Sequence, residues 1–307
     1  MKPALPFAFL LLLSSLSAAQ PTPRPAITGI SHVVLFADNL SKSREFYVSL
    51  VGWDPVPAGA AHSGVRIYAN HSQYIELISP PRAGILDRLD AIYFSTSDAS
   101  ALRRYLGAHG VAVPAAVTRS SDGSRSFQVL DPEGNKVGFA QPGRHFPPEP
   151  ADASRRLSAH ILHAGYVVRN RAALDHFYKD ILGFHLYWQG GAHPGETDWV
   201  MMQVPNGADW FEYMLNLPAQ PSRSQLGSAD HFAPGVVSVA QLQSRLERRG
   251  WAPPSGKNPQ VLGVDGKMQL DLRDPDGTRV EFMEYLPVKQ PCCSPYTGVQ
   301  PSPPTGW

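Results

Sequence analysis

Two stretches decide the fold: Ile30-Ser-His-Val-Val-Leu-Phe-Ala-Asp-Asn39 and Ile161-Leu-His-Ala-Gly-Tyr-Val-Val-Arg-Asn170. Each is a short apolar run of strand character that ends in polar turn residues. Each then leads into an amphipathic helix that contains Phe-Tyr and stops at a glycine, Gly52 in one copy and Gly183 in the other. The same unit therefore occurs twice in the chain.

The repeat continues downstream of these helices. Tyr74-Ile-Glu-Leu77 matches Trp210-Phe-Glu-Tyr213, and Asp131-Pro-Glu-Gly134 matches Asp274-Pro-Asp-Gly277. The offset grows from 131 residues at the first strand (161 − 30) to 143 at the Asp-Pro turns (274 − 131), as small loop insertions would produce. The pattern predicts two copies of one domain, which a Pro-rich linker joins and a Pro-rich tail follows; the domains are residues 28–143 and 158–287, the linker is 144–157 and the tail is 288–307.

Each copy also divides into two halves. The order strand, helix, strand, strand, strand is found twice in each copy, and in the second copy the two predicted helices cover residues 171–182 and 240–249. Because a single half cannot bury its sheet face alone, the two halves must pack together. The sequence therefore predicts an α+β fold with two tandem domains, each a pair of βαβββ modules that form a curved mixed sheet around a cleft.

Composition and the N-terminal residues indicate the class of protein. The 307 residues carry a net charge of +1 and are 43% hydrophobic, so there is no basic excess that would attract nucleic acid or an anionic membrane. Residues 1–19 combine a basic start, an apolar run and small residues before a cleavage point after Ala19, which is typical of a signal peptide and too short to span a membrane. We therefore expect a secreted or periplasmic protein without a membrane span.

The two cysteines of the chain, Cys292 and Cys293, are adjacent in the Pro-rich tail. Bridged cysteines usually have Cα atoms about 4.4–6.8 Å apart, so we do not expect this pair to bridge. An intermolecular disulfide, an unpaired exposed pair and a metal site remain alternatives.

The second copy contains a set of residues with metal-ligand character. His163 and Glu212 are 49 residues apart, and His231 and Glu281 are 50 apart. Duplicated half-domains predict this symmetry if each half supplies one imidazole and one carboxylate to a common centre. Such a set suits a divalent Zn, Ni, Co, Mn or Fe ion and leaves positions for water or a chelating substrate. A carboxylate on an apolar strand also needs a partner, because burying it unpaired is expensive.

The first copy lacks half of this set. His32 and Glu76 are present, but Ala91 occupies the place of His231 and Gly138 that of Glu281. We therefore expect no catalytic ion in the first copy, which becomes a structural partner for the second.

Other histidines and tryptophans of the second copy are weaker candidates. His160 lies three residues before His163 and hence on the opposite face of the strand, so we place it outside the site. We expect His185 and His193 near the mouth of the cleft, and core or cleft-wall positions for Trp188, Trp199 and Trp210.

The fourfold βαβββ pattern, with Phe-Tyr helices closing at glycine and an Asp-Pro turn before the last strand, resembles the vicinal oxygen chelate superfamily. This superfamily includes glyoxalase I, extradiol dioxygenases and bleomycin resistance proteins. The run Glu212-Tyr-Met-Leu-Asn216 is similar to the Glu-Leu-Thr-x-Asn segment of glyoxalase I, whose Glu is a metal ligand. The resemblance implies metal ligands at His163, Glu212, His231 and Glu281. It also implies a lyase or isomerase that acts on a small vicinal-oxygen substrate through an enediolate, with Glu212 or Glu281 as the catalytic proton shuttle.

Two alternatives belong to other classes. The first is an extradiol-type Fe(II) dioxygenase that uses His163, His231 and Glu281, although strand 267–272 lacks the additional His or Tyr such enzymes carry. The second is a non-enzymatic protein that sequesters a ligand in the cleft and so confers resistance. The expected partner is a small-molecule substrate, nucleic acid is not expected, and a homodimer is left open.

Overall fold

The computed structural model describes residues 23–57, 64–143, 152–253 and 258–305. The predicted signal peptide, 1–19, lies outside the described residues. No helix in these ranges is long and apolar enough to cross a membrane.

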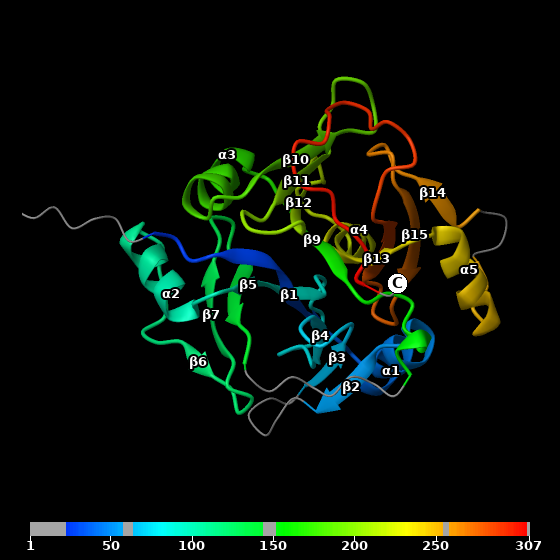
Figure 1. Cartoon of the computed structure of the whole chain (residues 1–307), viewed down its shortest axis with the longest axis horizontal. Coiled ribbons are helices and arrows are strands. Elements are labelled where there is room, and N and C mark those ends of the chain that lie inside the picture. Colours follow the sequence, from blue (N-terminus) through cyan, green and yellow to red (C-terminus); the bar gives the residue numbers. More distant parts are fainter. Residues whose placement is uncertain (1–22, 58–63, 144–151, 254–257, 306–307) are drawn as a thin grey trace, which may run out of the picture.

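The first domain is an eight-stranded mixed sheet in the order β2-β3-β4-β1-β5-β8-β7-β6 (Figure 1). Its two modules meet at β1 and β5, which pair antiparallel, while β4 and β8 flank them in parallel. Its elements are β1 (Ile27–Phe36), α1 (Leu40–Glu45), η1 (Phe46–Val51), β2 (Asp54–Pro57), β3 (Val65–Tyr68), β4 (Tyr74–Ile78), β5 (Leu89–Thr96), α2 (Ala99–Ala108), β6 (Thr118–Arg119), β7 (Arg125–Leu130) and β8 (Lys136–Gln141).

The second domain repeats this topology in the order β10-β11-β12-β9-β13-β16-β15-β14. One short helix, α4, is an addition that the repeat did not predict. After η2 (Ala153–Arg155), the elements are β9 (Ile161–Val167), α3 (Arg171–Asp175), η3 (His176–Ile181), β10 (His185–Gly190), β11 (Trp199–Gln203), β12 (Trp210–Met214), α4 (Arg223–Ala229), β13 (His231–Val236), α5 (Val239–Arg248), β14 (Gln260–Leu262), β15 (Met268–Arg273) and β16 (Arg279–Glu284). The predicted α+β fold of two tandem domains, each with a curved mixed sheet, is confirmed.

The Phe-Tyr helices have the same local design in both domains. The side chains of Asn39 and Asn170 cap the helix starts by accepting a backbone N–H three residues later. Each helix then changes from α to π geometry at its Phe-Tyr turn, in η1 and η3. The chain leaves through Gly52 and Gly183, at φ of 86° and 76°, a conformation that favours glycine.

The two domains are locked together by the residues that repeat between them. Tyr47, on the first domain's helix, donates its hydroxyl to Asp274 in the Asp-Pro turn of the second domain at 2.9 Å. Tyr178, on the second domain's helix, approaches Asp131 in the first domain's turn at 3.5 Å. Both tyrosines are fully buried. Each helix therefore braces the last hairpin of the other domain.

The apolar core is likewise continuous across the two domains. Phe232 of β13 packs against Tyr47 and Trp53 of the first domain, with ring centroids 6.3 and 6.2 Å apart. Phe94 of β5 packs against Phe184 of the second domain at 5.1 Å. Figure 1 shows α1 below β13 and α3 above the end of β7, consistent with this exchange.

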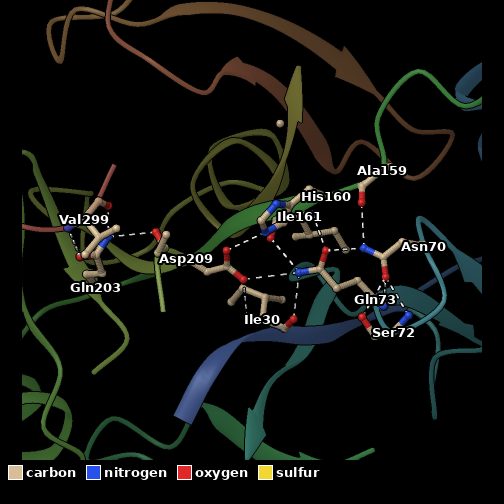
Figure 2. A network of polar contacts seen from close by, with 12 residues as sticks. Ile30, Asn70, Ser72, Gln73, Ala159, His160, Ile161, Gln203, Asp209 and Val299 are labelled. Atoms are coloured by element: carbon tan, nitrogen blue, oxygen red, sulfur yellow. Dashed lines mark hydrogen bonds and ion pairs between the residues drawn. The ribbon is translucent and has the colours of Figure 1, made fainter. Parts of the chain in front are cut away.

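A buried polar network joins the starts of β1 and β9 (Figure 2). Asp209 accepts the backbone N–H of Ile30 at 2.8 Å and contacts His160 Nε2 at 2.7 Å. The Gln73 amide accepts the N–H of Ile161 and donates to the carbonyls of both Ile30 and Ile161. His160 is therefore an interface residue outside the cleft, as predicted.

The Pro-rich tail is packed along the second domain. Its Cys292 N–H donates to the Val264 carbonyl beyond β14, and Trp188 Nε1 on β10 donates to the Cys292 carbonyl. Because β10 and β14 are the opposite edges of the second sheet, the tail spans the open side of the half-barrel. Figure 1 shows it in red between these two strands.

The expectation that the adjacent cysteines would not bridge is wrong. Cys292 and Cys293 form a disulfide across a Cα separation of 3.8 Å. This separation is shorter than the range of about 4.4–6.8 Å on which the expectation relied. The backbone at Cys293 is left-handed, with φ of 74°.

The cross-domain hydroxyl bonds can be tested with matched variants. We expect Tyr47→Phe to lower the free energy of unfolding by about 1–2 kcal/mol, because Asp274 loses a buried donor. Tyr178→Phe is the comparison, and we expect a smaller loss because its contact is longer. Denaturant unfolding of both variants measures the difference, and equal losses would contradict the assignment.

The interface also predicts a pH dependence. Burial lowers the pKa of His160, but the Asp209 carboxylate more than offsets this, so the pKa lies above its usual value. A raised folded-state pKa gives stability that is fully present below the unfolded value of about 6.5 and is lost as pH rises through the folded value. The stability difference between wild type and His160→Gln should therefore be larger at about pH 5.5 than at about pH 9. Denaturant unfolding at both pH values measures it, and a difference independent of pH would refute this assignment.

Candidate metal centre

Four buried side chains converge in the concave face of the second sheet. They are those predicted from the sequence, and each comes from a different strand: His163 from β9, Glu212 from β12, His231 from β13 and Glu281 from β16. One ligand atom from each lies within 4.8 Å of all the others, and this is the only such group among the described residues. Period-two alternation on adjacent strands explains the convergence, because all four residues point to the same face.

The separations between donor atoms fit a shared cation. His163 Nε2 lies 3.0 Å from His231 Nε2 and 3.4 Å from a carboxylate oxygen of each glutamate. His231 Nε2 lies 3.3 Å from Glu212 and 2.9 Å from Glu281. Donor atoms about 3 Å apart are expected when each makes a bond of about 2.0–2.2 Å to one ion. Two histidine nitrogens and two carboxylate oxygens also form a donor set common to divalent transition metals.

Neighbouring groups fix the orientation of both imidazoles. His231 Nδ1 faces the Ala229 carbonyl at 2.7 Å, so Nδ1 carries the hydrogen and the Nε2 lone pair faces the centre. His163 stacks on Trp210 with ring centroids 4.8 Å apart. Gly165 lies between these ligands, and a Cβ there would lie 3.2 Å from His231 Cε1. The bare glycine therefore leaves room for the histidine.

The charges of the site call for a cation at its centre. Burial alone lowers the pKa of His163, but Glu212 and Glu281 more than offset it and raise the pKa to about 9. Burial raises the pKa of both glutamates, but their charged neighbours more than offset this. His163 lowers the pKa of Glu212 below its usual value, and Arg279 makes the largest contribution to lowering that of Glu281. Both carboxylates are therefore ionised, and without a metal a proton on His163 partly neutralises them.

A cavity of about 260 Å³ opens onto the two glutamates. Its walls are mostly apolar, with Trp188, Trp199 and Met201 on one side and the 261–264 segment on the other. The polar groups that line it, apart from the glutamates, are Asp265, Gln269 and Arg279. The cleft can therefore hold a small molecule with an apolar body whose polar end reaches the ligands.

Arg279 was missed in the sequence, although its position carried a signal. It lies two residues before Glu281 and hence on the same face of β16. Its guanidinium nitrogen lies 3.5 Å from the Glu281 carboxylate, which it helps to keep ionised. Arg279 thus fixes the charge state of one candidate ligand.

A buried lysine behind the site is a second feature the sequence did not indicate. Lys267 is fully buried, and its ammonium donates to the Tyr285 carbonyl at 2.6 Å. It also lies 5.2 Å from the Trp210 ring and 5.4 Å from Tyr296 of the tail. Burial lowers its pKa to about 8, despite the opposing effect of Asp265. Lys267 and the aromatic rings around it, Trp210 and Tyr296, form a cage. The tail is connected through this cage to Trp210, on which His163 stacks.

The remaining candidates are placed as follows. His185 contacts Gln203 and His193 is exposed, and neither is among the described residues that line the cavity. Their expected place near its mouth stays a prediction. The expected wall or core positions of Trp188, Trp199 and Trp210 are confirmed.

Comparisons with known proteins agree with this architecture. The sequence matches the Glyoxalase/Bleomycin resistance protein/Dioxygenase superfamily over residues 29–139 and 160–282. A search of curated proteins found no match.

Several solved structures have a similar fold. The Mn(II)-bound glyoxalase from Novosphingobium aromaticivorans is 19% identical, with a TM-score of 0.64 over 85% of this chain and 83% of its own. Homoprotocatechuate 2,3-dioxygenase from Arthrobacter globiformis is 17% identical, with a TM-score of 0.65 over 86% and 82%. An extradiol ring-cleaving dioxygenase from B. fuscum is 17% identical, with a TM-score of 0.64 over 85% and 73%. These similarities concern the fold, while the sequence match covers both repeats, so the chain belongs to the Glyoxalase/Bleomycin resistance protein/Dioxygenase superfamily.

Proposed function

We propose that the chain is a divalent-metal-dependent enzyme of the glyoxalase type, a lyase or isomerase that acts on a small substrate with two vicinal oxygens. We further propose, from residues 1–19, that it acts after export, in the periplasm or outside the cell. Its metal ligands would be His163, Glu212, His231 and Glu281.

The observation that carries this proposal is the position of Glu212. Its carboxylate lies 3.4 Å from His163 and 3.3 Å from His231, at the same centre as Glu281. Non-haem Fe(II) oxygenases typically use two histidines and one carboxylate, whereas a second carboxylate gives the centre a built-in proton acceptor.

The two glutamates differ in their surroundings, which suggests different roles. Glu281 is held between His231 at 2.9 Å and Arg279 at 3.5 Å, which suits a fixed ligand. Glu212 lies as far from His163 as Glu281 does, at 3.4 Å, but its contact to His231 is longer, at 3.3 Å. It also has no ion pair with an arginine among the described residues. We therefore assign Glu212 as the group that takes a proton from the substrate carbon and returns it to the neighbouring carbon.

A bound divalent ion would supply Lewis-acid chemistry, polarising the vicinal oxygens and stabilising the enediolate. The chain contributes the apolar walls of Trp188, Trp199 and Met201, which exclude water from the reacting carbon. A cavity of about 260 Å³ restricts the substrate to a small molecule.

Metal binding is the first testable consequence. We expect the purified protein to hold about one divalent ion per chain, measured by elemental analysis. Saturation at about 100 times the Kd should add about 2.7 kcal/mol to the free energy of unfolding. Glu281→Gln should lose most of the metal, and the exposed Glu247→Gln, the same chemical change on α5, should retain it. Wild-type protein without metal affinity would refute the proposal.

Proton transfer is the second consequence. Metal-loaded wild type in D₂O should exchange the carbon-bound hydrogen next to the carbonyl of dihydroxyacetone or of methylglyoxal hemithioacetals, measured by NMR. Glu212→Gln at saturating metal should exchange at least about 100-fold more slowly, because it lacks the proton acceptor. Metal content is measured in the same samples, so that loss of the ion is distinguished from loss of the base. A fully loaded variant that exchanges at the wild-type rate would contradict the role of Glu212.

The same protein tests the alternatives. Oxygen uptake with catechols and stoichiometric iron would support an extradiol dioxygenase. The strand before the second Asp-Pro turn, β15, carries no histidine or tyrosine, which argues against it. Tight binding of a small ligand without exchange or oxygen uptake would support a sequestering protein.

A further inference from the structure

The first domain contains a larger cavity than the metal cleft. It has a volume of about 450 Å³ and lies on the concave face of the first sheet, in the place that corresponds to the metal cleft of the second domain. Its floor includes His32 and Glu76, the two residues that match metal ligands.

The side chains at the bottom of this cavity differ from those of the second domain and leave no space for a metal ion. Tyr93 pairs with Gly138 in adjacent strands, and a Cβ on Gly138 would lie 2.1 Å from the Tyr93 ring. The tyrosine therefore fills the space that Glu281 uses in the second domain. Its ring also stacks on His32 at 4.1 Å, and Tyr74 stacks on the other face of His32 at 4.3 Å. The imidazole is held between two rings and cannot turn toward an ion.

An arginine replaces the metal as the counter-charge of Glu76. In the sheet register, Arg66 is opposite Glu76, whereas Met201 is opposite Glu212 in the second domain. Arg66 Nε donates to the Glu76 carboxylate at 3.1 Å, and the guanidinium lies 5.0 Å from the Tyr74 ring. The first domain lacks two of the four ligand positions, but the Arg66–Glu76 ion pair neutralises its remaining carboxylate. The buried polar groups at the bottom of the cleft are therefore paired with one another.

The walls of the two clefts have opposite chemistry. Of the described residues, 23 line the first cleft, and ten of these carry a hydroxyl group, seven of them serine or threonine and three tyrosine. None of the 12 described residues that line the metal cleft does. The first cleft therefore offers many donors and acceptors, whereas the second offers an apolar surface.

The charges in the first cleft are largely paired within the protein. Arg66 pairs with Glu76, and Asp90 pairs with Lys136 at 2.7 Å. Asp122, the remaining acid of the lining, lies 4.0 Å from Arg66. Neither a strongly anionic nor a strongly cationic ligand would find a complementary excess of charge.

We propose that this cleft is a second, metal-free binding site for a neutral polyhydroxylated small molecule of monosaccharide size. Each ligand hydroxyl both donates and accepts, which matches walls of serine, threonine and tyrosine hydroxyls around a neutralised ion pair. The site is independent of the metal centre and of the reaction proposed for it.

The test uses the full chain and probes with the same skeleton but different charge. Glucose, galactose, mannose and xylose are titrated by calorimetry and ligand-observed NMR, beside glucuronate and glucosamine as the anionic and cationic counterparts. We expect at least one neutral sugar to bind more tightly than both charged probes.

Matched variants locate the binding. Arg66→Met, which installs the residue of the second domain, should weaken sugar binding at least tenfold. Ser126→Ala removes one wall hydroxyl with little risk to folding and should weaken binding severalfold. Glu281→Gln and chelated wild type should bind sugar as well as the untreated protein does.

Three results would overturn the proposal. They are no binding of any neutral sugar, tighter binding of a charged probe, and sugar binding that Glu281→Gln abolishes but Ser126→Ala does not affect. The last would place the sugar in the metal cleft.

Discussion

A buried carboxylate needs a cation, and the rest of this structure depends on how that requirement is met. Glu212 and Glu281 lie in the middle of an apolar sheet, 5% and 3% exposed. Left alone they would be expensive to bury, and two imidazoles whose nitrogens face each other at 3.0 Å do not neutralise them unless a proton or metal ion is present. The first domain meets the same requirement at Glu76 with Arg66. The two domains therefore share a fold and a buried carboxylate at the same position. In the first domain the counter-charge is Arg66, whereas the second domain has a candidate metal site.

The first domain also contributes to the position of a strand of the candidate metal centre. Its Tyr47 donates to Asp274, in the turn that leads into β16, the strand that carries Arg279 and Glu281. The candidate ligand is thus positioned partly by a residue of the other domain. Because the Phe-Tyr helices and Asp-Pro turns pair across the domains, they repeat in the sequence even where the metal residues do not.

The sequence predicted what local periodicity and internal symmetry determine. The repeats defined the two domains, and the near-equal gaps of 49 and 50 residues identified the four residues that the structure brings together. It could not predict that Tyr93 fills the space above Gly138, because this depends on which side chains face each other across adjacent strands. The cage around Lys267 and the cross-domain hydroxyl bonds are likewise contacts between residues distant in the chain. The prediction for the cysteine pair failed for a different reason. It relied on the Cα separation usual for disulfides, and this pair forms a bridge at 3.8 Å, below that range.

The tail accounts for a further difference between the two clefts. The second sheet leaves its half-barrel open between β10 and β14, and the tail bonds to both sides of that opening through Trp188 and Val264. Both residues also line the metal cleft, so the tail fixes the walls that limit it to about 260 Å³. Since Tyr296 of the tail also bonds to Asp265, the tail constrains a polar group of the cleft as well as its shape. A segment outside the repeats therefore helps to shape the cleft beside the candidate metal centre, together with the strands of the sheet.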